Sequence, residues 1–176
     1  MNKAELRQQL RHARLGMSGE ERQAMSAMIN ERLMAAVDWS SVHFLHYYEP
    51  LMELGEVDIS GFINSLGRAH PHIELFTTRK FDDVWQVVPI DETKSVRTPA
   101  FDLIIVPLLG FDPVSLHRLG YGGGFYDRFL GTQQQAQKIG VCYERGRIEN
   151  LPSELHDIAL SQIVTEQTVY GIDTQV

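Results

Sequence analysis

The sequence contains very little cysteine and no long hydrophobic run. Its single cysteine, Cys142, excludes an internal disulfide and a metal site built from several cysteines. No apolar segment approaches the ~18–20 residues that a bilayer-spanning helix needs, and the charged N-terminal residues lack the apolar stretch of a secretory signal. We therefore expect a cytoplasmic protein with no membrane partner, in which Cys142 is a core residue of segment 138–143 rather than a nucleophile.

Basic residues are also in the minority. The 16 lysines and arginines are outnumbered by 23 aspartates and glutamates, which gives a net charge of −7. This balance argues against a protein that coats nucleic acid, although a local basic pocket can exist on an acidic surface. A chain of 176 residues is long enough for one full core. We expect a single domain over 1–176 and a monomer whose partners are small molecules, in particular anions.

Predicted helices and strands alternate along the chain. Helices are expected at 2–15, 18–37, 56–66 and 125–130, the second opened by a Ser18/Glu21 capping box and directing Met25, Met28, Ile29 and Leu33 inward. Strands are expected at 42–48, 73–77, 84–90, 103–106, 139–143 and 162–164, and the polar stretch 79–99 reads as an excursion or a small hairpin. This order predicts an α/β, three-layer sandwich with a mostly parallel sheet flanked by helices on both faces.

Residues 118–128, with the sequence RLGYGGGFYDR, carry the strongest functional signal. The glycines at 120 and 122–124 allow positive φ angles and let backbone N–H groups approach an anion. Arg118 and Arg128 add planar donors suited to phosphate oxygens. The segment is neither a Walker loop nor a Gly-x-Gly-x-x-Gly turn. A purely structural strand-to-helix turn is the alternative, but the flanking charges favour a phosphate-binding loop.

A second basic feature lies on the first predicted helix. Lys3, Arg7, Arg11 and Arg14 interleave with apolar residues at helical spacing, which predicts an amphipathic helix with one basic face. A solvated face is the common explanation for such a pattern. Binding of phosphate is the alternative.

Several segments, taken in order, resemble the 5-formyltetrahydrofolate cyclo-ligases, also called methenyltetrahydrofolate synthetases. The most specific is Val106-Pro-x-x-Gly-Phe-Asp followed by Arg118-x-Gly-x-Gly-x-Gly-Phe-Tyr-Asp-Arg. The others are KAELR at 3–7, EVD at 56–58, LHD at 155–157 and IVTE at 163–166. The resemblance covers nearly the whole chain. It implies a cytoplasmic α/β enzyme that uses ATP and Mg²⁺ to convert 5-formyltetrahydrofolate to 5,10-methenyltetrahydrofolate, releasing ADP and phosphate.

The resemblance also implies roles for individual residues. Contacts with ATP would come from Lys3, Arg7, Arg118, Gly120, Gly122, Gly123, Gly124, Phe125, Tyr126 and Arg128. Folate would contact Glu56, Gly122, Phe125 and Tyr126. Asp127 and Asp157 would hold Mg²⁺, and Tyr126 and Arg118 would act in catalysis.

Each carboxylate also has a structural alternative. Asp127 could pair with Arg128 on the helix surface, Asp157 could cap a turn, and Glu56 could be an acidic residue in the first turn of a helix. A binding protein that has lost turnover is the main functional alternative. A sugar-phosphate isomerase or acyl-CoA-transferring enzyme on a related scaffold is a weaker one.

The middle of the chain departs from the family pattern. A Leu/Phe-Pro-Arg turn is reduced to FTTRK at 76–80, and a Gly-Ile-x-Glu-Pro segment is reduced to Thr98-Pro99. In this region Trp85 could form a wall of the folate pocket, although a core position is the more common one for a tryptophan in a strand. Basic residues at 79, 80 and 145 are expected near the glutamate tail of a folate.

Overall fold

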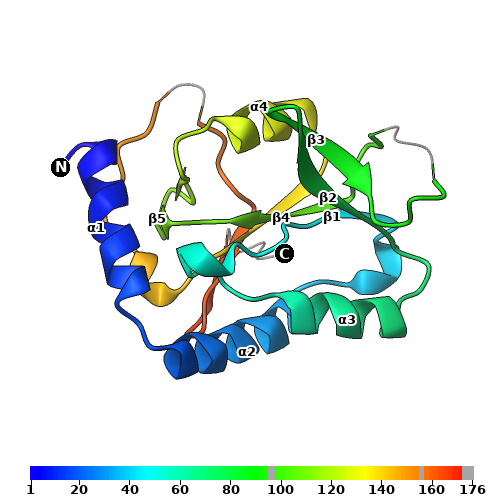
Figure 1. The fold of residues 1–176 in the computed structure, drawn as a ribbon, viewed down its shortest axis with the longest axis horizontal. Helices are drawn as coiled ribbons and strands as arrows, with labels where there is room; N and C mark the ends of the chain where they lie inside the picture. Colours follow the sequence, from blue (N-terminus) through cyan, green and yellow to red (C-terminus); the bar gives the residue numbers. More distant parts are fainter. Residues whose placement is uncertain (95–97, 155–156, 172–176) are drawn as a thin grey trace, which may run out of the picture.

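A mostly parallel sheet forms the centre of the molecule (Figure 1). The computed structural model describes residues 1–94, 98–154 and 157–171. Residues 155–156 of the LHD segment and part of the predicted 79–99 excursion lie outside this range. Within it, a seven-stranded sheet has the order β3-β2-β1-β4-β7-β8-β9. The strands are β1 (Phe44–His46), β2 (Glu74–Phe81), β3 (Val84–Pro89), β4 (Leu103–Pro107), β7 (Gln137–Val141), β8 (Gln162–Val164) and β9 (Val169–Gly171).

Helices cover both faces of this sheet, as expected for a three-layer α/β sandwich (Figure 1). They are α1 (Lys3–Leu15), α2 (Gly19–Ala35), α3 (Ser60–Ala69) and α4 (Phe125–Thr132). Alternate residues of β4 point to opposite faces, since Leu103 and Ile105 pack with α2 and α3 whereas Ile104 packs with α4. The expected fold class is therefore confirmed. None of the helices in the described ranges combines the length and the apolar character needed to cross a membrane.

The first two helices begin close to their predicted starts, and each opens with a capping box, of which only the second was predicted. Asn2 accepts the N–H groups of Ala4 and Glu5 at 3.0 and 2.9 Å and completes a capping box with Glu5. The Ser18/Glu21 box opens α2. Of the residues expected to face inward from α2, Met28 is 44% exposed, so that assignment was wrong.

Helix α3 begins at Ser60, four residues after the predicted start at position 56. The carbonyl of Glu56 accepts the Tyr143 hydroxyl at 3.4 Å, and that of Val57 accepts the Tyr48 hydroxyl at 2.8 Å. The next carbonyl, of residue 58, accepts the Asn30 amide at 3.1 Å. Because three successive carbonyls bond to side chains from other parts of the chain, this segment runs as a loop, and Glu56 is not a helical residue.

Other predicted boundaries shifted where tertiary pairing decides them. Strand β1 is three residues long instead of 42–48, because the 3₁₀ turn Trp39–Ser41 precedes it. The polar stretch after residue 79 is the β2–β3 hairpin, turned at Asp82 and Asp83 with φ of 44° and 65°. The short strands β5 (Gly110–Phe111), β6 (Arg118–Leu119) and β9 were not predicted. Two or three residues are too few to produce a periodic signal.

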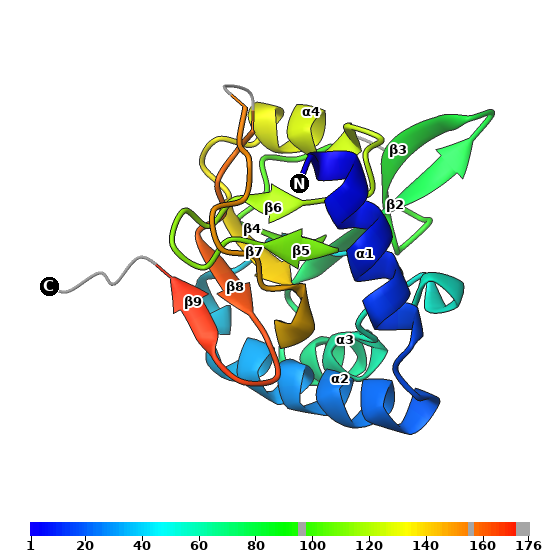
Figure 2. The ribbon, with the colours of Figure 1, turned by 90° about the vertical axis from the view of Figure 1, so that its left-hand side faces the viewer.

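Helix α1 lies beside β5 and β6 rather than on a face of the main sheet (Figure 2). Its Leu6 packs with Leu119 and Leu151 in a small apolar cluster. Gly110 of β5 and Gly146 of the 3₁₀ turn Glu144–Gly146 lie against each other beneath it. This packing brings the basic face of α1 to the loops that follow the parallel strands.

We expect Gly146→Ala to destabilise the protein by about 1–3 kcal/mol, because a Cβ would stand 2.9 Å from the Leu109 carbonyl oxygen and 2.5 Å from the Cys142 sulfur. Gly67→Ala is the matched control. It lies in the middle of α3 with nothing within 4 Å of the added Cβ, so it should stabilise by about 0.5–1 kcal/mol. Urea unfolding measures both, and equal stability of the two variants would contradict the close packing described for Gly146.

Candidate active site

A cleft of about 930 Å³ opens at the carboxyl ends of the parallel strands. Tyr48 follows β1, Thr78 and Arg79 belong to β2, and Pro107 ends β4. The remaining walls are α1 and the glycine-rich loop between β6 and α4. This is the position where open α/β sheets usually bind ligands.

The structure brings almost all of the predicted site residues together in this cleft. Those that line it are Lys3, Arg7, Glu56, Arg118, Gly120, Gly122, Gly123, Gly124, Phe125, Tyr126, Asp127 and Asp157. Arg128 is exposed on α4 and donates to the Gly123 carbonyl at 3.4 Å, so in this conformation it supports the loop from outside. The chemical roles of these residues stay predictions.

The glycine loop has the geometry expected of an anion-binding turn. Gly122 and Gly124 have φ of 97° and 66°, which side chains with a Cβ rarely adopt. Helix α4 begins at Phe125, directly after the loop, so the N–H groups of its first turn are available to an anion. From α1, Arg7 donates its Nε–H to the Gly120 carbonyl at 2.9 Å.

Arg118 is the most deeply buried cation of the cleft, with a side chain only 5% exposed. Its guanidinium donates to the Ile158 carbonyl at 2.6 Å and pairs with the Asp127 carboxylate. The expected pairing alternative for Asp127 involved Arg128, but the partner is Arg118. Burial lowers the pKa of Arg118, and the charges of Asp127 and Asp157 oppose that shift. An arginine stays protonated in either case, so this part of the cleft carries a permanent positive charge.

Lys3 and Asp157 form a second ion pair at the same end. The Nζ–Oδ2 distance is 2.7 Å, and Glu154 lies 3.2 Å from the same ammonium group. Burial alone would lower the pKa of Lys3, but the hydrogen bonds that its ammonium group donates to Asp157 and Glu154 raise it overall. Asp157 also accepts the Glu154 N–H at 2.8 Å, so the turn role considered for it is present alongside the ion pair.

The other end of the cleft contains a buried carboxylate. Glu56 is 4% exposed and accepts the Leu51 N–H at 2.9 Å. Burial raises the pKa of Glu56, against the lowering effect of that backbone hydrogen bond, the Tyr121 side chain and the Arg14 charge. Since α3 begins only at Ser60, the alternative of a first-turn helix acid was wrong.

Aromatic rings complete this end. Trp85 of β3 is 49% exposed and lies 6.4 Å from Phe125, measured between ring centroids. The core position expected for Trp85 was therefore wrong, and the pocket-wall alternative is the one observed. Tyr126 packs on Phe125, and burial followed by the Glu56 charge raises its pKa far above neutral pH. The Tyr126 phenol is therefore protonated and able to donate a hydrogen bond.

Arg14 and Tyr121 were not assigned to the site from the sequence. Arg14 is 6% exposed, donates to the Leu108 carbonyl at 3.2 Å and pairs with the Tyr121 hydroxyl. The only signal in the sequence for a role of Arg14 is its helical spacing from Lys3, Arg7 and Arg11. Arg79 and Lys80 line the cleft as expected.

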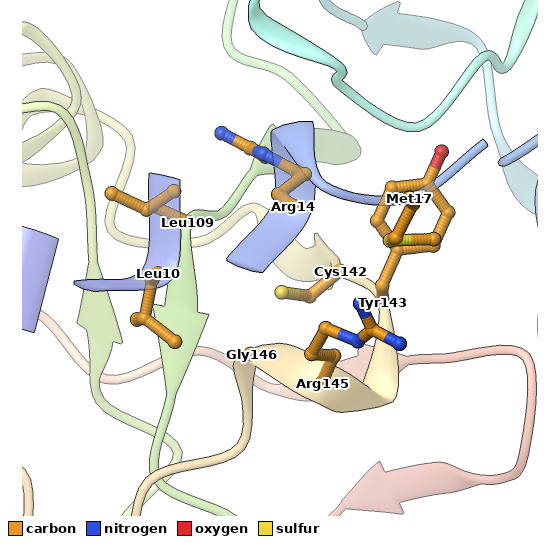
Figure 3. A pocket seen from close by; sticks show the side chains of 8 residues that line it. All are labelled: Leu10, Arg14, Met17, Leu109, Cys142, Tyr143, Arg145 and Gly146. Carbon is orange, nitrogen blue, oxygen red and sulfur yellow. The ribbon is translucent and has the colours of Figure 1, made fainter. Parts of the chain in front are cut away.

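A small cavity of about 10 Å³ lies under the last turn of α1 (Figure 3). Figure 3 shows Arg14 and Met17 on one side and the 142–146 segment on the other. Arg145 lines this cavity and donates to the Ala13 carbonyl at 3.2 Å, away from the cleft where a folate tail was expected. Cys142 is buried as expected, and burial raises the pKa of its thiol to about 12, which keeps it unreactive.

Fold and cleft together define a class: a three-layer α/β protein with a mostly parallel sheet and a glycine-rich loop that lines a cleft at the carboxyl ends of its parallel strands. The sequence model of the 5-formyltetrahydrofolate cyclo-ligase family matches residues 65–166. The chain belongs to this family of ligases, which confirms the resemblance seen in the sequence.

Similar proteins match over nearly their full lengths. The chain is 30% identical to the 5-formyltetrahydrofolate cyclo-ligase of Escherichia coli K12, over 92% of this chain and 98% of that one. It is 28% identical to the Mycoplasma pneumoniae enzyme of the same name, over 95% and 100%. Two solved 5,10-methenyltetrahydrofolate synthetases share the fold. The M. pneumoniae structure has a TM-score of 0.81 at 27% identity, covering 94% and 99%, and the Aquifex aeolicus structure 0.82 at 26%, covering 100% and 95%.

His46 is a buried histidine under the aromatic wall, bonded through Nε2 to Thr78 Oγ1 at 2.8 Å. Burial lowers the pKa of His46 from 6.5 to about 3. Between these two pKa values His46 is protonated in the unfolded chain but not in the folded protein. The free energy of unfolding therefore falls as the pH drops from about 6.5 toward 3. We expect His46→Leu to remove about 1.4 kcal/mol per pH unit of this dependence, measured by urea unfolding between about pH 4 and 6.

His43→Leu is the control, because it removes a histidine that is exposed. If His46→Leu kept the full pH slope of the wild type, the buried neutral state assigned to His46 would be incorrect.

Proposed function

We propose that this protein converts 5-formyltetrahydrofolate to 5,10-methenyltetrahydrofolate, with ATP as co-substrate and Mg²⁺ as cofactor, and releases ADP and phosphate. Family membership supports the folate substrate and the ligase reaction. The observation that carries the proposal is that one cleft joins a cationic glycine-lined end to an end with a buried carboxylate and aromatic rings. Its volume of about 930 Å³ is at the upper end of the usual range for small-molecule sites.

The chemistry requires activation of a poor leaving group. The formyl oxygen attacks the γ-phosphorus of ATP, the new O–P bond forms and ADP leaves. The neighbouring secondary amine of the folate then attacks the formyl carbon and closes the ring. The C–O bond breaks, phosphate departs with that oxygen, and the amine proton leaves with it. Positioning and neutralisation of charge supply most of the catalysis in phosphoryl transfer.

The cationic end suits the triphosphate. Its glycine loop presents N–H groups at the start of α4, and Lys3 and Arg7 reach the same space from α1. In the described part of the chain, Arg7 uses one of its five N–H donors on the Gly120 carbonyl, and the others can bind phosphate oxygens. Arg118 supplies a buried positive charge for the transferred group. Arg128 would turn toward the phosphates from the outer side of the loop.

The same end also fits Mg²⁺. Asp127 and Asp157 offer carboxylate oxygens, the ligand type this ion prefers, and each is balanced by a cation in the free protein. Among the described residues no group of three or more His, Cys, Asp or Glu could hold a metal by itself. Mg²⁺ commonly uses one or two carboxylates and completes its shell with substrate phosphates and water. When bound, the ion would neutralise charge on the phosphates.

The other end suits the pterin. The Glu56 carboxylate can accept two N–H bonds from a 2-aminopteridine edge. Phe125, Tyr126 and Trp85 offer flat apolar surfaces to the rings, and the flanking Gly122 allows close approach. Because the Tyr126 phenol is protonated, it can donate to the formyl oxygen or amine region. We place this enzyme in the cytoplasm as a single-domain monomer that acts on small molecules.

The reaction can be followed directly, since methenyltetrahydrofolate absorbs in the near ultraviolet and its formyl precursor does not. We expect product to appear only when ATP and Mg²⁺ are both present, and to stop when a chelator removes the metal. Binding of both substrates without any product would instead indicate a binding protein derived from this family.

Two isosteric substitutions separate the ends of the cleft. Glu56→Gln should weaken folate binding by tenfold or more, the loss expected for a hydrogen bond to a charged group, and leave the nucleotide Kd within about twofold. Asp127→Asn should raise the Mg²⁺ requirement about tenfold and leave the folate Kd within about twofold. Titration calorimetry and steady-state kinetics measure these values. Equal loss of both ligands in both variants would contradict the assigned division of the cleft.

A further inference from the structure

Tyr121 lies in the middle of the glycine loop and is held firmly for a loop residue. Its carbonyl accepts the Arg11 guanidinium at 3.3 Å. The Arg11 and Arg14 guanidinium carbons lie 5.5 and 5.4 Å from its ring centroid. Two cation–π contacts therefore fix the ring against α1.

The hydroxyl group of Tyr121 has a defined direction. Arg14 donates to it, because a guanidinium has donors and no acceptor. The phenol proton is therefore free to point to a different acceptor. Tyr121 and Glu56 line the same cleft, and each side chain influences the pKa of the other. Arg14 thus holds the Tyr121 hydroxyl, and that hydroxyl in turn interacts with the Glu56 carboxylate.

The Glu56 carboxylate has hydrogen-bond partners in the protein but also unused acceptor positions. One oxygen of Glu56 accepts the Leu51 N–H at 2.9 Å. A carboxylate has about four acceptor positions, so with Leu51 and Tyr121 bound it retains capacity for two N–H groups of a ligand. The two protein donors decide how the remaining lone pairs face the cleft.

We propose that Tyr121 is a positioning residue for folate recognition, which acts through Glu56 by holding its carboxylate in the orientation that receives the pteridine N–H groups. This proposal rests on the proposed function and deepens it. Because Tyr121 belongs to the loop that would wrap the phosphates, it also ties the shape of that loop to the folate end of the cleft.

A pH profile distinguishes this role from simple support of the loop. Folate binding needs ionised Glu56 and is lost as pH falls through its pKa, which burial raises and the Tyr121 interaction lowers. Loss of the Tyr121 hydroxyl raises that pKa further, so the acid limb moves to higher pH. The other groups that face Glu56 are Arg14, whose charge lowers its pKa, Glu53, whose charge raises it, and the phenols of Tyr48, Tyr126 and Tyr143.

Tyr121→Phe is the test, because it keeps the ring between Arg11 and Arg14 and removes only the hydroxyl. We expect the Kd for 5-formyltetrahydrofolate to rise about tenfold, the acid limb to move to higher pH, and the Kd for ADP to stay within about twofold. Tyr170→Phe is the matched control. It removes a tyrosine hydroxyl that donates to Glu144 at 2.6 Å outside the cleft, and it should bind folate like the wild type.

A double-mutant cycle with Glu56→Gln shows whether Tyr121 acts through Glu56. If it does, Tyr121→Phe causes no further loss of folate affinity in the Glu56→Gln background. Additive losses, or an unchanged folate Kd and pH limb in Tyr121→Phe alone, would overturn this proposal and leave the proposed function standing. A wild-type protein that binds neither folate nor nucleotide would overturn both.

Discussion

Hydrogen bonds from the arginines of α1 to the glycine-rich loop are the constraint on which the cleft depends. A loop with four glycines in five residues loses much conformational entropy when it adopts one shape. Arg7 and Arg11 bind the carbonyls of Gly120 and Tyr121, and Arg14 binds the Tyr121 hydroxyl. With its carbonyls held by α1, the loop is left with its N–H groups to offer to a ligand. The basic face of this helix therefore has a structural role and, in the proposed function, a binding role.

The charges of the cleft are balanced before any ligand arrives. Arg118 pairs with Asp127, Lys3 pairs with Asp157, and Glu56 is approached by the Arg14–Tyr121 pair. A buried charge without a partner would cost several kcal/mol, so these pairs allow an acidic protein of net charge −7 to maintain a cationic pocket. On binding, phosphates would replace the carboxylates as partners of Arg118 and Lys3, and a metal ion would replace these cations as the partner of Asp127 and Asp157. These side chains are thus paired in the free protein and still chemically suited to ligands.

Local sequence signals predicted the elements that local forces control. The capping box at Ser18 begins a helix, and the strand, glycine loop and helix around residue 120 follow in the predicted order. Where distant contacts compete, the predictions failed. The carbonyls of residues 56–58 accept hydrogen bonds from one side chain of α2 and from two tyrosines that follow β1 and β7, so α3 starts late. Trp85 was expected in the core, but the hairpin that carries it projects over the cleft and leaves its ring half exposed.

The α/β layering, the family and most of the residues in the cleft follow from the sequence, because apolar periodicity, caps and a glycine-rich motif act over a few neighbouring positions. The pairing of individual side chains depends on the tertiary structure. Lys3 meets Asp157 across 154 positions and Arg14 meets Tyr121 across 107. Spacing along the chain carries no information about such contacts, since they form only when α1 packs beside β5 and β6. The pairing considered for Asp127 was with its neighbour Arg128, whereas the cation that it binds is the buried Arg118, nine positions away.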